Sequence, residues 1–289
     1  MRTLVAKQNN REFKILYINR DKDVGRRKAL EVNLGWLGLE AERITAVEGR
    51  KLPQQLQHMF PPSRLSPGEV GCYASHMLAW TKLVENDIPF ALILEDDAAM
   101  DKGFAKIINE TLAAAPEGWD FIHVSTARRF SHRPLAKLPS GRTLARFSRV
   151  PAATRGYLIS NAGARKMLKP IPRQFPVDLD TRLPWKFDLD SYGLVEALVG
   201  EKSSVSTISP IPSAGRSRLR RGIRLNNPLH TWSGLVFNIR KLGFAWWLRC
   251  LAANVSRRIG KSVTNIVRFV GTWTANFRST TLKRAAAKV

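Results

Sequence analysis

The chain has 289 residues, of which 44% are hydrophobic and 9% aromatic, so it can bury a sizeable core and is not a wholly disordered protein. Its 19 glycines exclude a collagen-like repeat, and its two cysteines exclude a disulfide framework. The formal net charge is +24, from 47 Lys+Arg against 23 Asp+Glu, which favours an anionic partner such as nucleic acid or a membrane surface.

The positive charge is concentrated in the last third of the chain. From Lys202 onward the sequence has 17 basic residues and no acidic residue. We therefore divide the chain into a folded domain over residues 1–213 and a cationic tail over residues 214–289.

Residues 1–14 lack the apolar core of a secretory signal, and no apolar stretch is long enough to span about 30 Å of hydrocarbon. These features predict a cytoplasmic protein that does not cross a membrane.

Apolar runs and helical spacing alternate along the first domain. Strands are predicted at residues 13–19, 44–47, 90–94, 119–124 and 157–160. Helices are predicted at residues 26–38, 66–86 and 162–168, with a polar loop over residues 54–64. Strands that alternate with helices predict an α/β fold with a mostly parallel sheet.

The helix at residues 66–86 has the clearest start signal. Ser66 can cap the helix, Pro67 suits its first turn, and Glu69 can complete a capping box. Asn86 is the expected end of the helix.

Three consecutive carboxylates, Glu95, Asp96 and Asp97, follow the strand at residues 90–94. We call them the acidic triple. Ligands of open α/β sheets bind at the carboxyl ends of the strands. Adjacent carboxylates repel one another, and Mg²⁺ or Mn²⁺ prefers oxygen ligands and commonly bridges a carboxylate to a substrate phosphate. The acidic triple therefore predicts a metal–diphosphate site, and the alternative is a solvated acidic turn.

Several motifs in this order resemble glycosyltransferase family 25, which includes bacterial lipooligosaccharide and lipopolysaccharide galactosyltransferases and collagen galactosyltransferases. The resemblance covers roughly residues 13–201 and is carried by Ile18-Asn19, Arg26-Arg27, Pro67-Gly68-Glu69-Val70-Gly71-Cys72-Tyr73-Ala74-Ser75-His76, Trp80, Ala91-Leu92-Ile93-Leu94-Glu95-Asp96-Asp97, Gly156-Tyr157-Leu158-Ile159-Ser160 and Gly163-Ala164. The resemblance implies a GT-A-like (Rossmann-like) fold, a UDP-sugar donor, Mn²⁺ or Mg²⁺, and inversion at the anomeric carbon. It also implies a lipid-linked oligosaccharide acceptor and favours galactose as the transferred sugar.

The resemblance also suggests roles for particular residues. Asp97 is the first candidate for a metal ligand, and Asp96 is the second. Alternatively, Asp96 or Glu95 contacts the ribose or holds the metal ligands in place. For the nucleotide, the candidates are Asn19 and Arg26 or Arg27, because a helix N-terminus after a strand favours anions. The alternative for the arginines is an exposed pair on a helix face.

An inverting transfer requires a general base that removes the proton of the acceptor hydroxyl. Asp178 and Asp180 are the candidates, and Asp178 is preferred. The alternative is a loop of solvated aspartates.

Cys72 and His76 are four residues apart and share one face of the helix at residues 66–86. A metal pair is disfavoured because the sequence offers no third ligand. We expect this face to pack beneath the donor site, with His76 donating a hydrogen bond to substrate or backbone.

The tail contains two basic amphipathic segments. One apolar stripe comprises Leu235, Ile239, Leu242, Trp246 and Cys250, and a second comprises Val263, Ile266, Val270, Trp273 and Phe277. Such helices favour in-plane binding to an anionic membrane, here the cytoplasmic face of the inner membrane, or they cover the catalytic domain or a partner chain. Two other functional hypotheses compete with this one. The first is a nucleic-acid-binding protein, but the sequence has no recognised nucleic-acid-binding motif. The second is a catalytically inactive membrane adaptor.

Overall fold

The computed structural model describes residues 13–61, 65–100, 102–125, 131–151, 154–201 and 228–256. The strands of its main sheet are β1 (Lys14–Asn19), β2 (Glu42–Thr45), β3 (Phe90–Glu95), β5 (Phe121–His123), β6 (His132–Lys137), β7 (Thr143–Phe147), β8 (Gly156–Ser160) and β9 (Ser191–Leu194). The helices are α1 (Val24–Trp36), α2 (Gln54–Gln57), α3 (Pro67–Glu85), α4 (Phe104–Ala114), α5 (Asn161–Met167), α6 (Val177–Asp180), α7 (Pro184–Phe187) and α9 (Pro228–Leu242), followed by a helix over residues 244–256.

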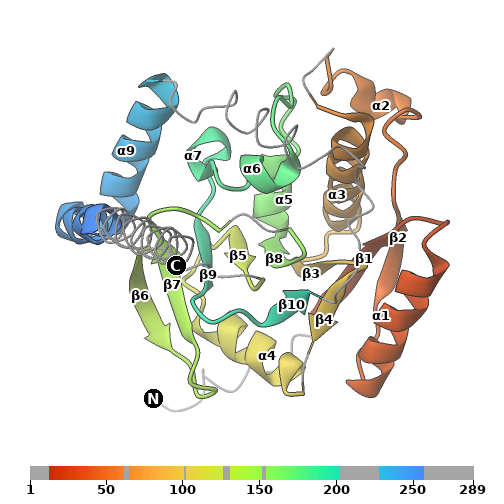
Figure 1. Ribbon diagram of the computed structural model, residues 1–289, viewed down its shortest axis with the longest axis horizontal. Coiled ribbons are helices and arrows are strands. Elements are labelled where there is room, and N and C mark those ends of the chain that lie inside the picture. The colour runs from red at the N-terminus through yellow and green to blue at the C-terminus, as the bar shows by residue number, and fades with distance from the viewer. Residues whose placement is uncertain are drawn as a thin grey trace, which may run out of the picture.

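The eight strands lie in the order β2-β1-β3-β8-β5-β9-β7-β6 (Figure 1). Six of them run in the same direction, and β7 and β8 run opposite to the rest. A small antiparallel ribbon joins β4 (Ala98–Met100) to β10 (Val199–Glu201). The predicted α/β class with a mostly parallel sheet is confirmed.

Helices cover both faces of the sheet, with α3 and α5 on one face and α1 and α4 on the other (Figure 1). Successive residues of a strand point to opposite faces, so each central strand serves two cores. In β1, Leu16 and Ile18 belong to the core beneath α3, while Ile15 and Tyr17 belong to the core beneath α1 and α4. Burial on both faces explains why β1 and β3 are continuous apolar runs in the sequence.

The start of α3 is built as its sequence predicts. The Ser66 side chain accepts a hydrogen bond from the Glu69 backbone, and the Glu69 side chain accepts one from the Ser66 backbone, which completes the capping box. One turn later the helix approaches the loop after β2 so closely that a Cβ on Gly71 would lie 2.4 Å from the Val47 carbonyl oxygen. Glycine at this position therefore sets the distance between α3 and that loop.

Several elements were not predicted. The loop at residues 54–64 contains the short helix α2, and α4, β6, β7 and β9 lie in segments to which no element was assigned. Most side chains of β6 are exposed or half-buried, because it is the edge strand of the sheet and carries charged residues and a proline. Edge strands of this kind lack the apolar alternation on which sequence prediction depends.

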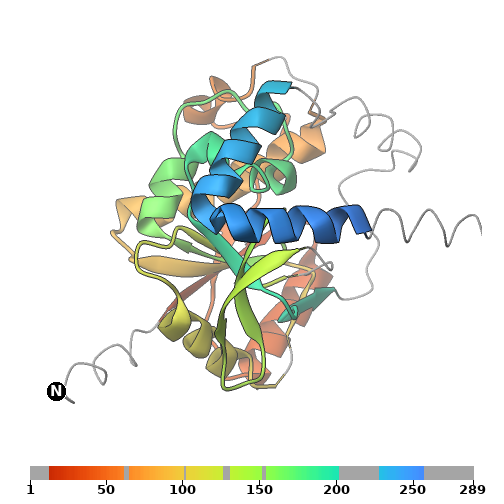
Figure 2. The same ribbon diagram turned by 90° about the vertical axis from the view of Figure 1, so that its left-hand side faces the viewer.

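The described part of the tail, residues 228–256, packs on the domain rather than extending from it (Figure 2). Asn238 donates to the Ser148 carbonyl, Arg133 donates to the Leu242 carbonyl, and Lys241 forms an ion pair with Asp190 at 2.8 Å. Leu242 and Cys250 of the predicted membrane-facing stripe are buried. The expectation that this stripe faces a bilayer is therefore corrected for the described residues, because its apolar side faces the protein.

Two other predictions about the tail lie outside the described residues, namely the boundary after residue 213 and the second amphipathic stripe from Val263 to Phe277. Among the described helices, none combines the length and the apolar character that crossing a membrane requires.

Candidate active site

The acidic triple lies where the carboxyl ends of β1 and β3 meet the amino end of β8. Ile18 of β1 pairs with Glu95 of β3, and the Glu95 backbone N–H donates to the Arg155 carbonyl at 2.9 Å. Because β8 runs antiparallel to β3, the residues that precede β8 reach the same edge of the sheet as the triple. Each of the three carboxylates has its own partners there.

Glu95 is held from two sides. Thr154 Oγ1 donates to Glu95 Oε1 at 2.6 Å, and His76 Nε2 lies 3.5 Å from the same oxygen. Burial acts to raise the pKa of Glu95, but His76 and the Thr154 hydroxyl outweigh it, so the pKa lies below its ordinary value. Glu95 is therefore ionised at neutral pH, with a half-buried side chain.

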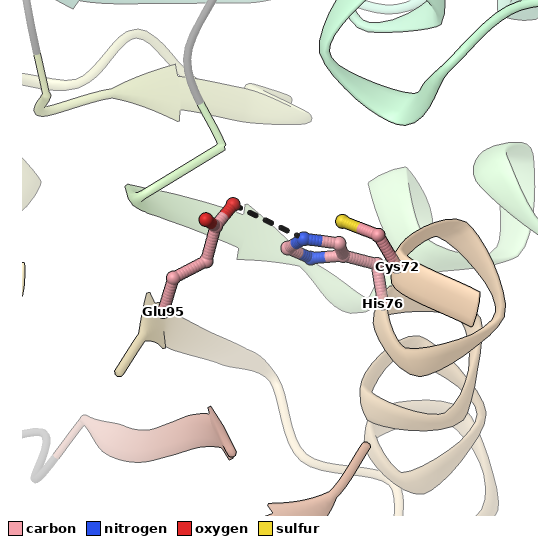
Figure 3. A group of neighbouring side chains, drawn as sticks. All are labelled: Cys72, His76 and Glu95. Atoms are coloured by element: carbon pink, nitrogen blue, oxygen red, sulfur yellow. Dashed lines mark ion pairs between the residues drawn. The ribbon is translucent and has the colours of Figure 1, made fainter. Parts of the chain in front are cut away.

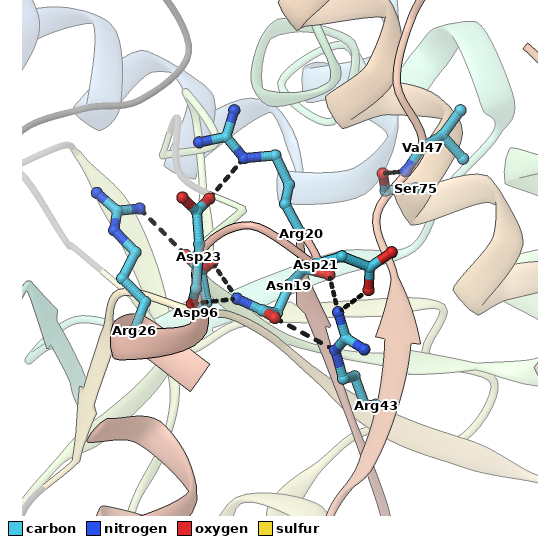
Figure 4. A network of polar contacts seen from close by, with 9 residues as sticks. All are labelled: Asn19, Arg20, Asp21, Asp23, Arg26, Arg43, Val47, Ser75 and Asp96. Atoms are coloured by element: carbon cyan, nitrogen blue, oxygen red, sulfur yellow. Dashed lines mark hydrogen bonds and ion pairs between the residues drawn. The ribbon is translucent and has the colours of Figure 1, made fainter. Parts of the chain in front are cut away.

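Asp96 joins β3 to the end of β1 and the start of α1 (Figure 4). Asn19 Nδ2 donates to Asp96 Oδ2 at 2.8 Å and also to the Asp23 carbonyl at 3.2 Å, while Arg26 Nη1 lies 3.1 Å from Asp96 Oδ1. The predicted nucleotide residues Asn19 and Arg26 are thus brought to the acidic triple. Arg27 is not, because its guanidinium faces Glu31 on the same helix at 4.0 Å.

Asp97 is paired with Arg155, whose Nε lies 3.1 Å from Asp97 Oδ1. Burial, followed by the negative charge of Glu95, raises the pKa of Asp97 above its ordinary value despite the arginine. A carboxylate in this situation gains from a further cation. Carboxylate oxygens such as those of Asp97 are the ligands that Mn²⁺ and Mg²⁺ prefer, so the residue fits either ion.

Thr154 and Arg155 were not identified from the sequence. Both lie immediately before the predicted strand at residues 157–160, and only the antiparallel direction of β8 brings them to the carboxyl end of β3. Strand direction cannot be deduced from the composition of a single strand, so the sequence carried no signal for this contact.

The two base candidates have different environments. Asp180 is fully buried, accepts a hydrogen bond from the Tyr73 hydroxyl at 2.9 Å and pairs with Lys186 at 2.9 Å. Asp178 is half-buried and lies in the first turn of α6, a helix that packs against α3. Asp180 is thus held in an interior ion pair, while Asp178 is partly accessible to solvent.

His76 is fully buried beneath the site rather than exposed to a ligand. Its Nδ1 lies 2.9 Å from the Tyr157 hydroxyl, which accepts a hydrogen bond from Trp80 Nε1 at 2.8 Å. The hydroxyl proton of Tyr157 is then available to Nδ1, which leaves the imidazole proton on Nε2, the nitrogen that faces Glu95. His76 thus connects the core of α3 to Glu95, and its expected hydrogen bond to substrate or backbone is not present among the described contacts.

Comparison with known proteins identifies the family of the chain. The family model described as "Glycosyltransferase family 25 (LPS biosynthesis protein)" matches residues 13–181. A "Glycosyltransferase 25 family member" of Drosophila melanogaster is 32% identical over 194 residues, which are 61% of this chain and 31% of that protein. "Procollagen galactosyltransferase 1-B" of Xenopus laevis is 29% identical over 181 residues, 57% of this chain and 30% of that protein.

Among solved structures, apo mouse xyloside xylosyltransferase 1 overlaps 62% of this chain and 77% of that chain with a TM-score of 0.31 and 12% identity, a level at which it carries no inference about this chain.

The family match covers more than half of the chain, and it includes β1, α3, β3 and β8, which together build the acidic edge of the sheet. The chain therefore belongs to glycosyltransferase family 25. It spans about a third of the length of the curated relatives it matches.

Proposed function

We propose that this protein is an inverting glycosyltransferase that moves a hexose, favoured as galactose, from a UDP-sugar to a lipooligosaccharide or lipopolysaccharide core acceptor. The observation that carries the proposal is the set of separately held carboxylates at one edge of the sheet, in a chain of this family. Asp96 is held by Asn19 and Arg26, and Asp97 by Arg155. A relative bears the name procollagen galactosyltransferase, which supports galactose.

Asp97 is the proposed ligand for Mn²⁺ or Mg²⁺, with Asp96 as a second. When bound, the ion supplies Lewis-acid stabilisation of charge on the departing nucleotide. Arg155 lies against Asp97, and its positive guanidinium can contact the phosphates of the nucleotide. Asn19 and Arg26, at the N-terminus of α1, are the proposed contacts to the nucleotide through the polar network that they share with Asp96.

Asp178 is the proposed general base. Its carboxylate is half-buried and lies at the N-terminus of α6, on the side of the site formed by α3. In this role Asp178 accepts the proton of the acceptor hydroxyl as that oxygen attacks the anomeric carbon. Asp180 is left out of the reaction because it is committed to Lys186 and Tyr73 in the interior.

We also propose that the tail holds the enzyme on the cytoplasmic face of an anionic membrane, through the side opposite to the predicted stripe. Four exposed residues lie on one side of the last described helix and form what we call the outer stripe, namely Phe244, Leu248, Leu251 and Val255. Their spacing of four, three and four residues gives a continuous apolar line. Because the chain has no acidic residue after Glu201, an anionic bilayer is the partner whose charge complements this surface.

The decisive experiment is a donor screen. Purified protein is incubated with Mn²⁺ and a panel of nucleotide sugars, and hydrolysis and thermal shift are measured for each donor. We expect hydrolysis of one UDP-hexose, and a thermal shift with UDP that requires the metal. Tight binding to heparin or RNA, without hydrolysis or thermal shift for any donor, would instead favour the nucleic-acid-binding hypothesis.

A further inference from the structure

The structure supplies the third ligand that the sequence lacked for Cys72 and His76. These two residues lie on successive turns of α3, and Glu95 reaches them from the end of β3 (Figure 3). Each of the three residues offers one potential ligand atom, and these three atoms lie within 4.8 Å of one another. A thiol, an imidazole and a carboxylate thus converge from two elements.

The imidazole of His76 points Nε2 into this cluster, where it faces the Glu95 carboxylate at ion-pair distance. His76 is fully buried, and its Nε2 has no hydrogen-bond partner although its Nδ1 is paired with Tyr157. Buried polar atoms are nearly always hydrogen-bonded, so a buried nitrogen held only by a long ion-pair contact is a position where a water or an ion is expected. Nε2 faces Glu95 Oε1 at 3.5 Å, and the Cys72 sulfur lies next to the same ring (Figure 3).

The contact between His76 and Glu95 has the spacing of two ligands of one tetrahedral cation. With bonds of about 2.0–2.3 Å, the ligand atoms of tetrahedral zinc are about 3.3–3.8 Å apart. The Nε2–Oε1 separation of 3.5 Å lies in that range. The cysteine sulfur lies within 4.8 Å of the other two ligand atoms, so a bound cation draws it inward where its separation exceeds that range. Cys72 and Glu95 are half-buried, which leaves the cluster a route to solvent.

Neighbouring residues hold two of the three side chains in place by hydrogen bonds. Thr154 fixes Glu95 through a hydrogen bond at 2.6 Å, and Tyr157 fixes the imidazole through Nδ1. Partners of this kind orient metal ligands and raise their affinity. A cation on Nε2 takes the place of the ring proton that Nε2 carries without it. The neutral ring then has its proton on Nδ1, and the Tyr157 hydroxyl changes from donor to acceptor in the contact at 2.9 Å.

We propose that Cys72, His76 and Glu95 form a site for a borderline-soft divalent cation, Zn²⁺ or its analogue Co²⁺, distinct from the hard-ion site at Asp97. Mixed sulfur, nitrogen and oxygen ligands select such ions over Mg²⁺, and the fourth position is left to water. Binding converts the Cys72 thiol to a metal-bound thiolate and releases its proton to solvent. Because Glu95 belongs to the acidic triple, we expect zinc to inhibit donor turnover; this consequence rests on the proposed function, whereas binding itself does not.

Cobalt spectroscopy tests the site directly. The chain has two cysteines, so a thiolate-to-cobalt charge-transfer band in the untagged, reduced, metal-free full chain must come from Cys72 or Cys250. We expect the band in wild type and in the control Cys250→Ser, its loss in Cys72→Ser, and its displacement by Zn²⁺. Zinc affinity, measured against a chromophoric chelator, should fall at least roughly tenfold in Cys72→Ser.

A second measurement needs no variant. Zinc should slow alkylation of Cys72 in the wild-type chain, as mapped by peptide mass spectrometry, and Mg²⁺ should not. Any of three results would overturn the proposal. The wild-type protein could lack the thiolate band, the band could survive in Cys72→Ser, or zinc could leave the alkylation of Cys72 unchanged. Zinc binding in the cobalt and chelator assays, combined with no hydrolysis of any nucleotide sugar in the zinc-free screen with Mn²⁺, would leave the cation site standing and count against the proposed transferase.

Discussion

Asp97 is the residue whose environment most favours a bound cation. Burial and the neighbouring charge of Glu95 raise its pKa, and Arg155 offsets this only in part. The ionised form of Asp97 is therefore disfavoured by its surroundings, although Arg155 contacts one of its oxygens. This is the arrangement expected of a metal ligand before the metal arrives.

We predict that Asp97→Asn lowers transfer by about 10²–10³-fold, with or without added Mn²⁺, because the ion then lacks its charged ligand. Initial rates at saturating donor give the effect. Asp188→Asn is the control, because Asp188 is an exposed aspartate in the connection after α7. Wild-type turnover in Asp97→Asn would remove Asp97 from the site.

Asp178 and Asp180 should separate into a catalytic and a structural residue. We expect Asp178→Asn to lower turnover by about 10²–10⁴-fold with donor affinity unchanged, because a general base acts on the acceptor. Asp180→Asn should instead lower the free energy of unfolding, because it leaves Lys186 without its buried partner. Steady-state kinetics and urea unfolding on both variants distinguish the two roles, and near-normal turnover in Asp178→Asn would end its candidacy.

At the scale of elements, the position of α3 depends on its contact with the loop after β2. The Ser75 hydroxyl accepts a hydrogen bond from the Val47 N–H at 2.8 Å and donates to the Gly71 carbonyl at 2.7 Å. Gly71 lies against the same loop, and a Cβ there would approach Val47 to 2.4 Å. The helix that carries Cys72 and His76 is therefore fixed by small residues and backbone contacts.

We predict that Gly71→Ala costs about 1–3 kcal/mol of unfolding free energy, because the added methyl forces α3 away from the loop. Gly35→Ala is the matched control. Gly35 lies in α1 with no atom within 4 Å of an added Cβ, so alanine there should be neutral or should stabilise by up to about 1 kcal/mol. Equal stability of the two variants in urea unfolding would refute the packing argument.

The contact of α9 with the domain depends on Asp190. Burial acts to raise the pKa of Asp190, but hydrogen bonds from Lys241 and Arg146 outweigh it, so the pKa lies below its ordinary value. A carboxyl with a lowered pKa in the folded state stabilises fully above about pH 4–5, and this contribution is lost as pH falls through the folded pKa.

We therefore predict that Lys241→Met lowers the free energy of unfolding by about 1 kcal/mol at pH 7 and by much less below the folded pKa of Asp190. Unfolding by urea at both pH values measures the difference. Arg165→Met, which breaks the exposed pair between Arg165 and Asp87, is the control and should have little effect at either pH. A pH-independent loss in Lys241→Met would show that packing, not the ion pair, holds α9.

At the scale of the whole molecule, charge and exposed apolar surface coincide in the tail. Helix α9 and the helix over residues 244–256 use one side to cover the domain and leave the outer stripe exposed, with Phe244 at 61% and Leu248 at 44% of full exposure. A lipid-linked acceptor would then lie at the same surface as the enzyme.

We predict that the double variant Phe244→Ser, Leu248→Ser binds vesicles of anionic phospholipid at least roughly tenfold more weakly than wild type, because burial of two such side chains contributes about 1.5–3 kcal/mol each. The control is Val32→Ser, Trp36→Ser, which removes two exposed apolar residues from α1. Vesicle co-sedimentation measures both, and truncation after Ser213 should abolish binding. Equal binding by the two double variants would count against the outer stripe, and equal binding with and without the tail would defeat membrane attachment.

The strands and helices of the first domain could be predicted because their signals are local. The apolar runs of β1 and β3 and the capping box of α3 all depend on residues close in the chain, and they were found near their observed bounds. The order of motifs carried the resemblance to the family. The edge strand β6 and its neighbour β7 could not be found in this way, because their stability comes from pairing with each other and with β9.

The sequence by itself determined the α/β class, the acidic triple at the end of β3 and the cationic character of the tail. Only the tertiary structure decided that Thr154 and Arg155 face the triple, that Asp180 is committed to Lys186, and that Glu95 joins Cys72 and His76. It also decided which side of the tail helix faces the domain. The physical reason is the same in each case, since strand direction and helix rotation are set by packing between segments that are distant in the chain, and a local pattern contains no record of them.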